Sequence, residues 1–268
     1  MSMFLHTLRR GAVAAWLGAL AIAQTPPVPP VDPNLPEQLK ELKSMVAEPK
    51  MESDFRAIGL IQKLTAQPKG LNPKDKDKLA KALGDVFRTG KLRTGNAEIL
   101  YREAADALGK LAEEGAKYLS RLPDEPRFKD NVPLVAHVLL ALGATQDQKQ
   151  VELLVETLSR SPHDELRAAA GEALGKYDDM DVKLRRDVVK MIIRSWGSLT
   201  EKATQPESSD PAAPINLDPQ NARKTLRAVE GKWVRTLGQL TGVSMSGFAD
   251  WQRWLNKNPN WNPPAKKP

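Results

Sequence analysis

Apolar and polar positions repeat with the period of an α-helix from about residue 51 to residue 199. Apolar residues recur at spacings of three and four, and no run of alternating β-branched residues favours a strand. The pattern therefore predicts an all-α fold. Two examples of the helical spacing are the sets Leu79, Ala82, Leu83, Val86, Phe87 and Val151, Leu154, Val155, Leu158.

The expected helix ends carry the residue types that begin and end helices. Asn72-Pro73 and Ser161-Pro162 each place a capping side chain before a proline at the first helical position. Gly90, Gly143 and Gly242 follow apolar runs, where glycine commonly stops a helix. These caps support the helical prediction independently of the apolar period.

A short segment recurs along the helical region. The sequence AADALGK (residues 104–110) returns as VLLALGA (138–144) and as AGEALGK (170–176), so Gly109, Gly143 and Gly175 lie 34 and 32 residues apart. A second amphipathic helix follows each copy, over roughly residues 113–122, 146–159 and 181–198. A repeated helix pair of about 33 residues predicts an α-solenoid of about three to four pairs.

The segment LRAAAGEALGK (residues 166–176) resembles the first helix of a HEAT repeat, of the short kind common in bacteria. Residues 97–199 hold three such units, and residues 51–90 form a divergent fourth. The middle unit departs from the pattern, since His137 and Val138 stand where Ala169 and Ala170 stand later, and its arginine is missing. The resemblance implies a solenoid that binds partners, and it carries over no catalytic residue.

The regions on either side of the repeats differ in composition. Residues 24–50 form a Pro-rich spacer and a short helix, residues 51–199 the HEAT-like domain, and residues 200–218 a flexible linker. Residues 219–268 form a Trp-rich helical segment. Its stretch 237–254 resembles a segment that often trails HEAT-like repeats in exported bacterial proteins.

Residues 1–23 have the features of a signal peptide. Arg9 and Arg10 precede 13 uncharged residues that end in Ala21-Ile22-Ala23. The apolar run is shorter than the roughly 20 residues that span a bilayer. We expect cleavage before Gln24 and a periplasmic or secreted protein without a transmembrane segment; an uncleaved membrane anchor is the alternative.

Composition excludes several kinds of site. The chain has no cysteine, which rules out disulfides, thiolate metal sites and thiol nucleophiles. The formal net charge of +7 becomes +5 without the leader, a mildly basic balance that names no partner by itself. We expect no nucleic-acid partner, because the chain leaves the cytoplasm.

Lys183, Arg186, Lys190 and Arg194 share one face of the helix expected after Asp181. Spacings of three and four place them opposite the apolar face. Such a basic stripe is suited to an acidic protein or an acidic envelope polymer. The alternative is an ordinary solvated helix face.

The tryptophans of the exported chain all lie near its C-terminus. Trp233 and Trp251 fall on the apolar faces of their helices, where they are expected to close a small core. Trp254 and Trp261 are the better candidates for exposed contacts, because stacking on a sugar ring needs an accessible indole.

The sequence carries no signature of a catalytic centre, a cofactor or a metal site. His137 is expected to be a satisfied core histidine, and His163, beside Asp164 and Glu165, lacks a second histidine at ligand spacing. Asp181 and its neighbours are explained by helix capping. The sequence therefore predicts a non-catalytic binding scaffold. The alternatives are a structural module of an envelope assembly and a carbohydrate-active enzyme that uses two carboxylates.

Overall fold

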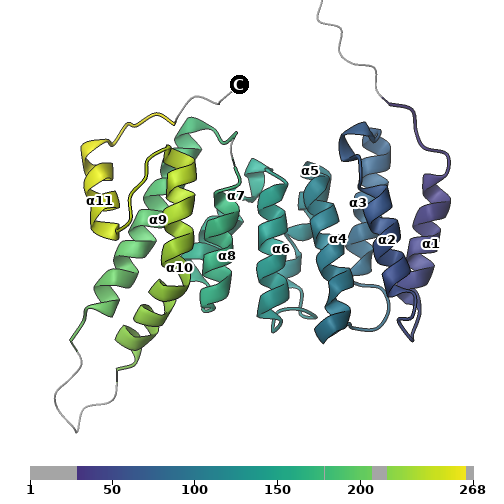
Figure 1. Cartoon of the computed structure of the whole chain (residues 1–268), viewed down its shortest axis with the longest axis horizontal. Coiled ribbons are helices and arrows are strands. Elements are labelled where there is room, and N and C mark those ends of the chain that lie inside the picture. Colours follow the sequence, from purple (N-terminus) through teal and green to yellow (C-terminus); the bar gives the residue numbers. More distant parts are fainter. Residues whose placement is uncertain (1–28, 178, 207–215, 264–268) are drawn as a thin grey trace, which may run out of the picture.

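The computed structural model describes residues 29–177, 179–206 and 216–263. Within these ranges the chain forms eleven α-helices and no strand, which confirms the predicted all-α class (Figure 1). The helices are α1 (Leu35–Ala47), α2 (Asp54–Leu64), α3 (Pro73–Val86), α4 (Ile99–Lys110), α5 (Glu113–Leu119), α6 (Val132–Ala144), α7 (Val151–Arg160), α8 (Asp164–Leu174), α9 (Val182–Ala203), α10 (Asp218–Thr241) and α11 (Phe248–Lys257). Short 3-10 helices span Pro68–Gly70, Gly95–Glu98, Leu122–Asp124 and Gln148–Gln150.

The helices form two rows that lie against each other. In one row α2, α4, α6, α8 and α10 contact one another in that order. In the other row α1 contacts α3, α3 contacts α5, α7 contacts α9, and α9 contacts α11. Successive helices alternate between the rows from one end of the molecule to the other (Figure 1). The apolar core fills the space between the rows.

The repeated Leu-Gly pairs lie at close contacts between neighbouring helices of the first row. A Cβ atom at Gly109 would stand 2.9 Å from the carbonyl oxygen of Ala141 in α6, and one at Gly143 would stand 2.6 Å from that of Ala173 in α8. At Gly175 it would stand 3.0 Å from Thr236 Oγ1 of α10. The spacing of these glycines is therefore the spacing of the helix contacts. Gly143 is not the predicted helix stop, since α6 continues through it.

The folded part begins before the expected boundary at residue 51. Helix α1 contacts both α2 and α3, and it buries Leu35, Leu42, Met45 and Val46. The amphipathic pattern of α1 was apparent in the sequence, but the prolines around it favoured a spacer. Its apolar face extends the core by one helix.

The C-terminal helices also belong to the same body. Helix α10 contacts α8 and α9, and Trp233 is fully buried against α8. The linker expected at residues 200–218 is shorter at both ends, because α9 continues to Ala203 and α10 begins at Asp218. Residues 207–215 lie outside the described ranges.

Some of the predicted helix caps are confirmed, and others are wrong. Asn72 caps α3 by accepting from the Lys74 N–H at 2.9 Å, and Asp181 caps α9 by accepting from Lys183 and Leu184. Ser161 is not the cap of α8, which begins two residues after Pro162 with His163 at the cap position. Gly90 and Gly242 both have a left-handed φ, 71° and 73°. Gly242 ends α10 as predicted, whereas α3 ends at Val86 and Gly90 lies in the loop that follows.

The leader predicted at residues 1–23 lies outside the described residues. Among the helices that the structure does describe, none is long and apolar enough to cross a lipid bilayer.

Candidate functional site

The structure divides the predicted basic stripe on α9. Lys183, Lys190 and Arg194 are exposed, and Lys190 Nζ lies 3.7 Å from Asp187 Oδ1. Arg186 instead reaches the chain after α11. It donates to the carbonyl oxygens of Trp261 at 2.6 Å and Asn260 at 2.9 Å, and to the side chain of Asn262 at 2.8 Å. Arg186 therefore fastens the C-terminal segment to α9 rather than facing a partner.

The tryptophans near the C-terminus form a cluster. The ring centroids of Trp251 and Trp254 are 5.7 Å apart, and those of Trp254 and Trp261 are 5.6 Å apart. Trp233 and Trp251 are fully buried, as predicted. Trp261 is not the expected exposed contact, since only 8% of it is accessible, and Trp254 is half-buried beside it. Trp261 follows the end of α11, so helical spacing assigned no face to it, and its ring packs beside that of Trp254.

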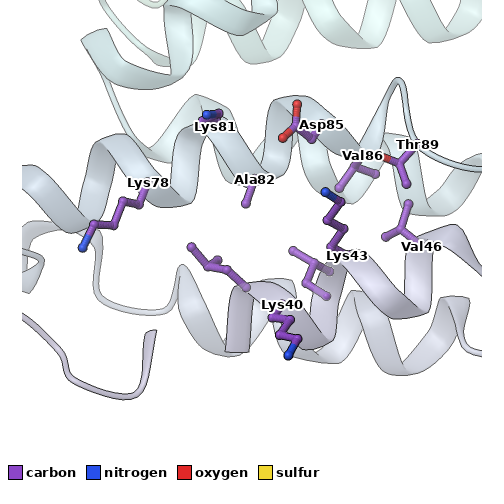
Figure 2. A pocket seen from close by; sticks show the side chains of 11 residues that line it. Lys40, Lys43, Val46, Lys78, Lys81, Ala82, Asp85, Val86 and Thr89 are labelled. Atoms are coloured by element: carbon purple, nitrogen blue, oxygen red, sulfur yellow. The ribbon is translucent and has the colours of Figure 1, made fainter. Parts of the chain in front are cut away.

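A hollow that sequence reasoning missed lies between α1 and α3 (Figure 2). This α1–α3 groove has a volume of about 340 Å³, within the usual range of ligand sites. Ala82 points into the space between the helices, and Lys43 extends across it from α1 towards Val86 of α3. The lining residues are Leu39, Lys40, Leu42, Lys43 and Val46 of α1, Lys78, Lys81, Ala82, Asp85 and Val86 of α3, and Thr89.

Apolar side chains make the floor of the α1–α3 groove. Leu42, Val46 and Val86 are almost completely buried, with 1%, 1% and 2% of their surface accessible. Leu39 and Ala82 are half-buried and continue this surface towards solvent. Alanine at position 82 leaves room where a larger residue would fill the space between the two helices. The hollow is thus a direct consequence of a small residue on the α3 side.

Lysines surround this apolar floor. Lys40 and Lys43 lie on α1, and Lys78 and Lys81 lie on α3, all four exposed. Lys78 Nζ is 3.6 Å from Asp75 Oδ1, whereas no described carboxylate lies within ion-pair distance of Lys40, Lys43 or Lys81. Among the described lining residues, Asp85 alone is acidic. The groove therefore combines an apolar floor with an excess of positive charge.

One end of the α1–α3 groove is fixed by a buried ion pair. Arg93 donates to both oxygens of Asp54 at 2.7 Å and also to the carbonyl oxygen of Val46 at 3.0 Å. The hydrogen bond to Asp54 raises the pKa of Arg93 above its ordinary value. Gly90 lies against the same Val46 carbonyl, where a Cβ atom would collide with it. These contacts hold the last turn of α1 to the loop that follows α3.

At the other end of the α1–α3 groove, two hydrogen bonds hold the residues before α1 against the start of α3. The backbone N–H of Asp32 donates to Asp75 Oδ2 at 2.8 Å, and Asn72 Nδ2 donates to the carbonyl oxygen of Pro29 at 2.7 Å. Asp75 is buried in the first turn of α3, where its charge also faces the positive end of the helix. The walls of the α1–α3 groove are therefore tied together at both ends.

A second hollow lies where α8 begins beside α10. It includes His163, Asp164, Glu165, Lys224 and Lys232, with a volume of about 480 Å³. Three of its charged groups have partners: Thr225 donates to Asp164 Oδ1 at 2.5 Å, Lys224 Nζ lies 3.8 Å from Asp164 Oδ2, and Lys232 Nζ lies 3.1 Å from Glu172 Oε2. These contacts join α8 to α10 and account for the polar residues there.

The other histidine in the described ranges lies between two helices of the first row. His137 Nε2 of α6 lies 2.9 Å from Asp106 Oδ1 of α4, so the ring contributes to the contact between these helices. In the part of the chain that the structure describes, no group of three or more histidine, aspartate or glutamate residues is arranged to hold a metal ion.

Comparison with known protein families, with curated proteins and with solved structures finds no match for this chain.

Proposed function

We propose that the protein is an exported, non-catalytic binding protein built from HEAT-like repeats, and that it holds an anionic, partly apolar partner in the α1–α3 groove. The repeat assignment is supported by Gly109, Gly143 and Gly175, because each Leu-Gly pair meets the next helix of its row. Export is supported by the sequence of residues 1–23.

The observation that carries the proposal is the pairing of an apolar floor with unpaired lysines. Covering apolar surface releases about 25 cal/mol per Å². Lys40, Lys43 and Lys81 offer positive charge to a partner without first breaking an ion pair with a described carboxylate. For a partner that is apolar on one side and negatively charged at its edges, both the burial of apolar surface and the attraction to the lysines favour binding.

The chemistry of the α1–α3 groove supports reversible binding rather than catalysis. Its described lining consists of aliphatic side chains, four lysines, Asp85 and Thr89. Proton transfer needs an acid and a base held in matched positions, and a single carboxylate beside exposed lysines does not supply such a pair.

A fluorescent dye that is apolar and negatively charged, anilinonaphthalene sulfonate, tests this function. We expect the folded wild-type protein to enhance its emission at the α1–α3 groove. Ala82→Trp should abolish most of this emission by filling the space, and the double variant K43Q/K81Q should reduce it by removing charge. The matched control is K63Q/K110Q, which removes two exposed lysines from α2 and α4, outside the groove and outside the basic stripe of α9.

Comparison of the dye emission of the wild-type protein and the three variants tests the proposed function. Loss of dye emission in the two groove variants, with emission of the K63Q/K110Q control unchanged, would support the proposal. Equal emission from all four proteins would contradict it, because the dye would then bind elsewhere. Circular dichroism of each variant establishes that the helical fold is intact.

A further inference from the structure

We infer that the occupant of the α1–α3 groove is an acidic amphipathic helix of a partner protein. This inference rests on the proposed function and names the class of partner. It follows from how the lysines are distributed along the groove, and from the place of the groove between two neighbouring helices of one row.

The lysines are arranged along two edges rather than gathered at one end. Lys40 and Lys43 are three residues apart on α1, and Lys78 and Lys81 are three residues apart on α3, about one turn in each case. A fatty-acid anion carries one carboxylate at one end and would use one or two of these cations. An amphipathic helix with acids on both flanks of its apolar stripe would use both edges.

The floor also matches the apolar stripe of a helix. From Leu39 to Val46 the α1 wall is about 11 Å long, or about two turns. A helix presents apolar residues at i, i+3, i+4 and i+7 over the same distance, and docking of such a stripe in a groove is a common mode of recognition. The half-buried Leu39 and Ala82 would then be covered, as comparable residues are between helices within the rows.

The chain's own N-terminal segment is a poor occupant by charge. Residues 1–28 include Arg9 and Arg10 and no acid. Placed beside four lysines, these arginines would be repelled. An occupant rich in glutamate or aspartate avoids this repulsion and is instead attracted by the positive charge of the lysines.

The test uses a fluorescein-labelled synthetic peptide of about 14 residues, long enough for two turns and their ends. Leucines form one stripe, with glutamates on both flanks. Three comparison probes distinguish charge, apolar pattern and acyl-chain binding. They are a peptide of the same composition with the stripe scrambled, a peptide with lysine in place of glutamate, and palmitate as a competitor of anilinonaphthalene sulfonate. Fluorescence anisotropy against the full-length protein gives the Kd of each labelled peptide.

We expect the acidic amphipathic peptide to bind with a Kd in the micromolar range, as suits a small interface. The scrambled and basic peptides should bind at least about tenfold more weakly. Ala82→Trp and K43Q/K81Q should each weaken the acidic peptide by about tenfold, and binding should weaken as ionic strength rises. The control K63Q/K110Q should leave the Kd unchanged, because these exposed lysines of α2 and α4 lie outside both the α1–α3 groove and the basic stripe of α9.

Two results would overturn the inference. Equal binding of the ordered and scrambled acidic peptides would mean that charge alone is recognised. Displacement of the dye by palmitate, with no binding of the acidic peptide, would assign the groove to an acyl chain. In that second case the dye result still supports the proposed function, so failure of the inference is distinguishable from failure of the function.

Discussion

Single side chains join segments of this protein that are far apart in the sequence. Arg93 connects the start of α2 with the end of α1, and Arg186 connects α9 with residues 260–262. Both are arginines whose several N–H groups meet carbonyl or carboxylate oxygens in fixed directions. Helical spacing predicted the face on which Arg186 lies. It could not predict a partner 75 residues away, whereas the caps at Asn72 and Asp181 depend on neighbouring residues and were predictable.

At this scale we expect Arg186→Gln to loosen the C-terminal segment. The change removes charge-assisted hydrogen bonds to two carbonyl oxygens, each worth about 1.5–3 kcal/mol, with partial compensation by water. Trp261 should become more accessible, which acrylamide quenching of tryptophan fluorescence measures. The double variant K183Q/K190Q on the same helix should leave quenching unchanged. Unaltered quenching in Arg186→Gln would mean that aromatic packing alone holds the segment.

At the scale of helices, small residues determine how closely neighbours approach. Gly143 lies within α6 and allows contact with Ala173 of α8, while Ala82 on α3 leaves the α1–α3 groove open. The sequence revealed the repeat of the Leu-Gly pairs, but not which helix each glycine would meet. The groove was not foreseen because α1 was expected to belong to a spacer, and a hollow between two helices requires both to be placed.

Gly143→Ala is the direct test of these close contacts. Its added methyl group would lie 2.6 Å from the Ala173 carbonyl oxygen, so α6 and α8 must separate slightly. We expect a loss of about 1–3 kcal/mol in the free energy of unfolding, measured by urea denaturation. Gly231 of α10 is the matched control, since a Cβ atom there has no contact within 4 Å. Gly231→Ala should stabilise the protein by about 0.5–1 kcal/mol through helix propensity. Stabilisation in both variants would show that the α6–α8 contact is looser than described.

At the scale of the whole molecule, the two rows extend from α1 to α11 within the described ranges (Figure 1). The helical class and most of the helices could be predicted, because they follow from the apolar period along the chain. The C-terminal limit of the folded body could not be predicted, because it depends on contacts between residues that lie on either side of residues 200–218. The Pro-rich composition there suggested a separate C-terminal segment, yet Trp233 Nε1 donates to the Arg167 carbonyl oxygen at 3.4 Å and Thr236 Oγ1 donates to that of Gly171 at 2.9 Å.

These contacts predict unequal effects of shortening the chain at its two ends. Removal of residues 207–268 takes away α10 and α11, and it exposes the surfaces of α8 and α9 that Trp233, Leu237 and Leu240 cover. Among the described helices, removal of residues 1–50 takes away α1, which covers parts of α2 and α3. We expect the first truncation to lower the melting temperature by at least about 10 °C, given several buried side chains worth about 1.5–3 kcal/mol each. The second should cause a smaller decrease, and both are measured by circular dichroism.

If residues 51–199 alone melted as cooperatively and at the same temperature as the full chain, α10 would be an accessory to the repeats. A large decrease on loss of α10 would instead make it a structural member of the array, through the same kind of row contact that joins α6 to α8.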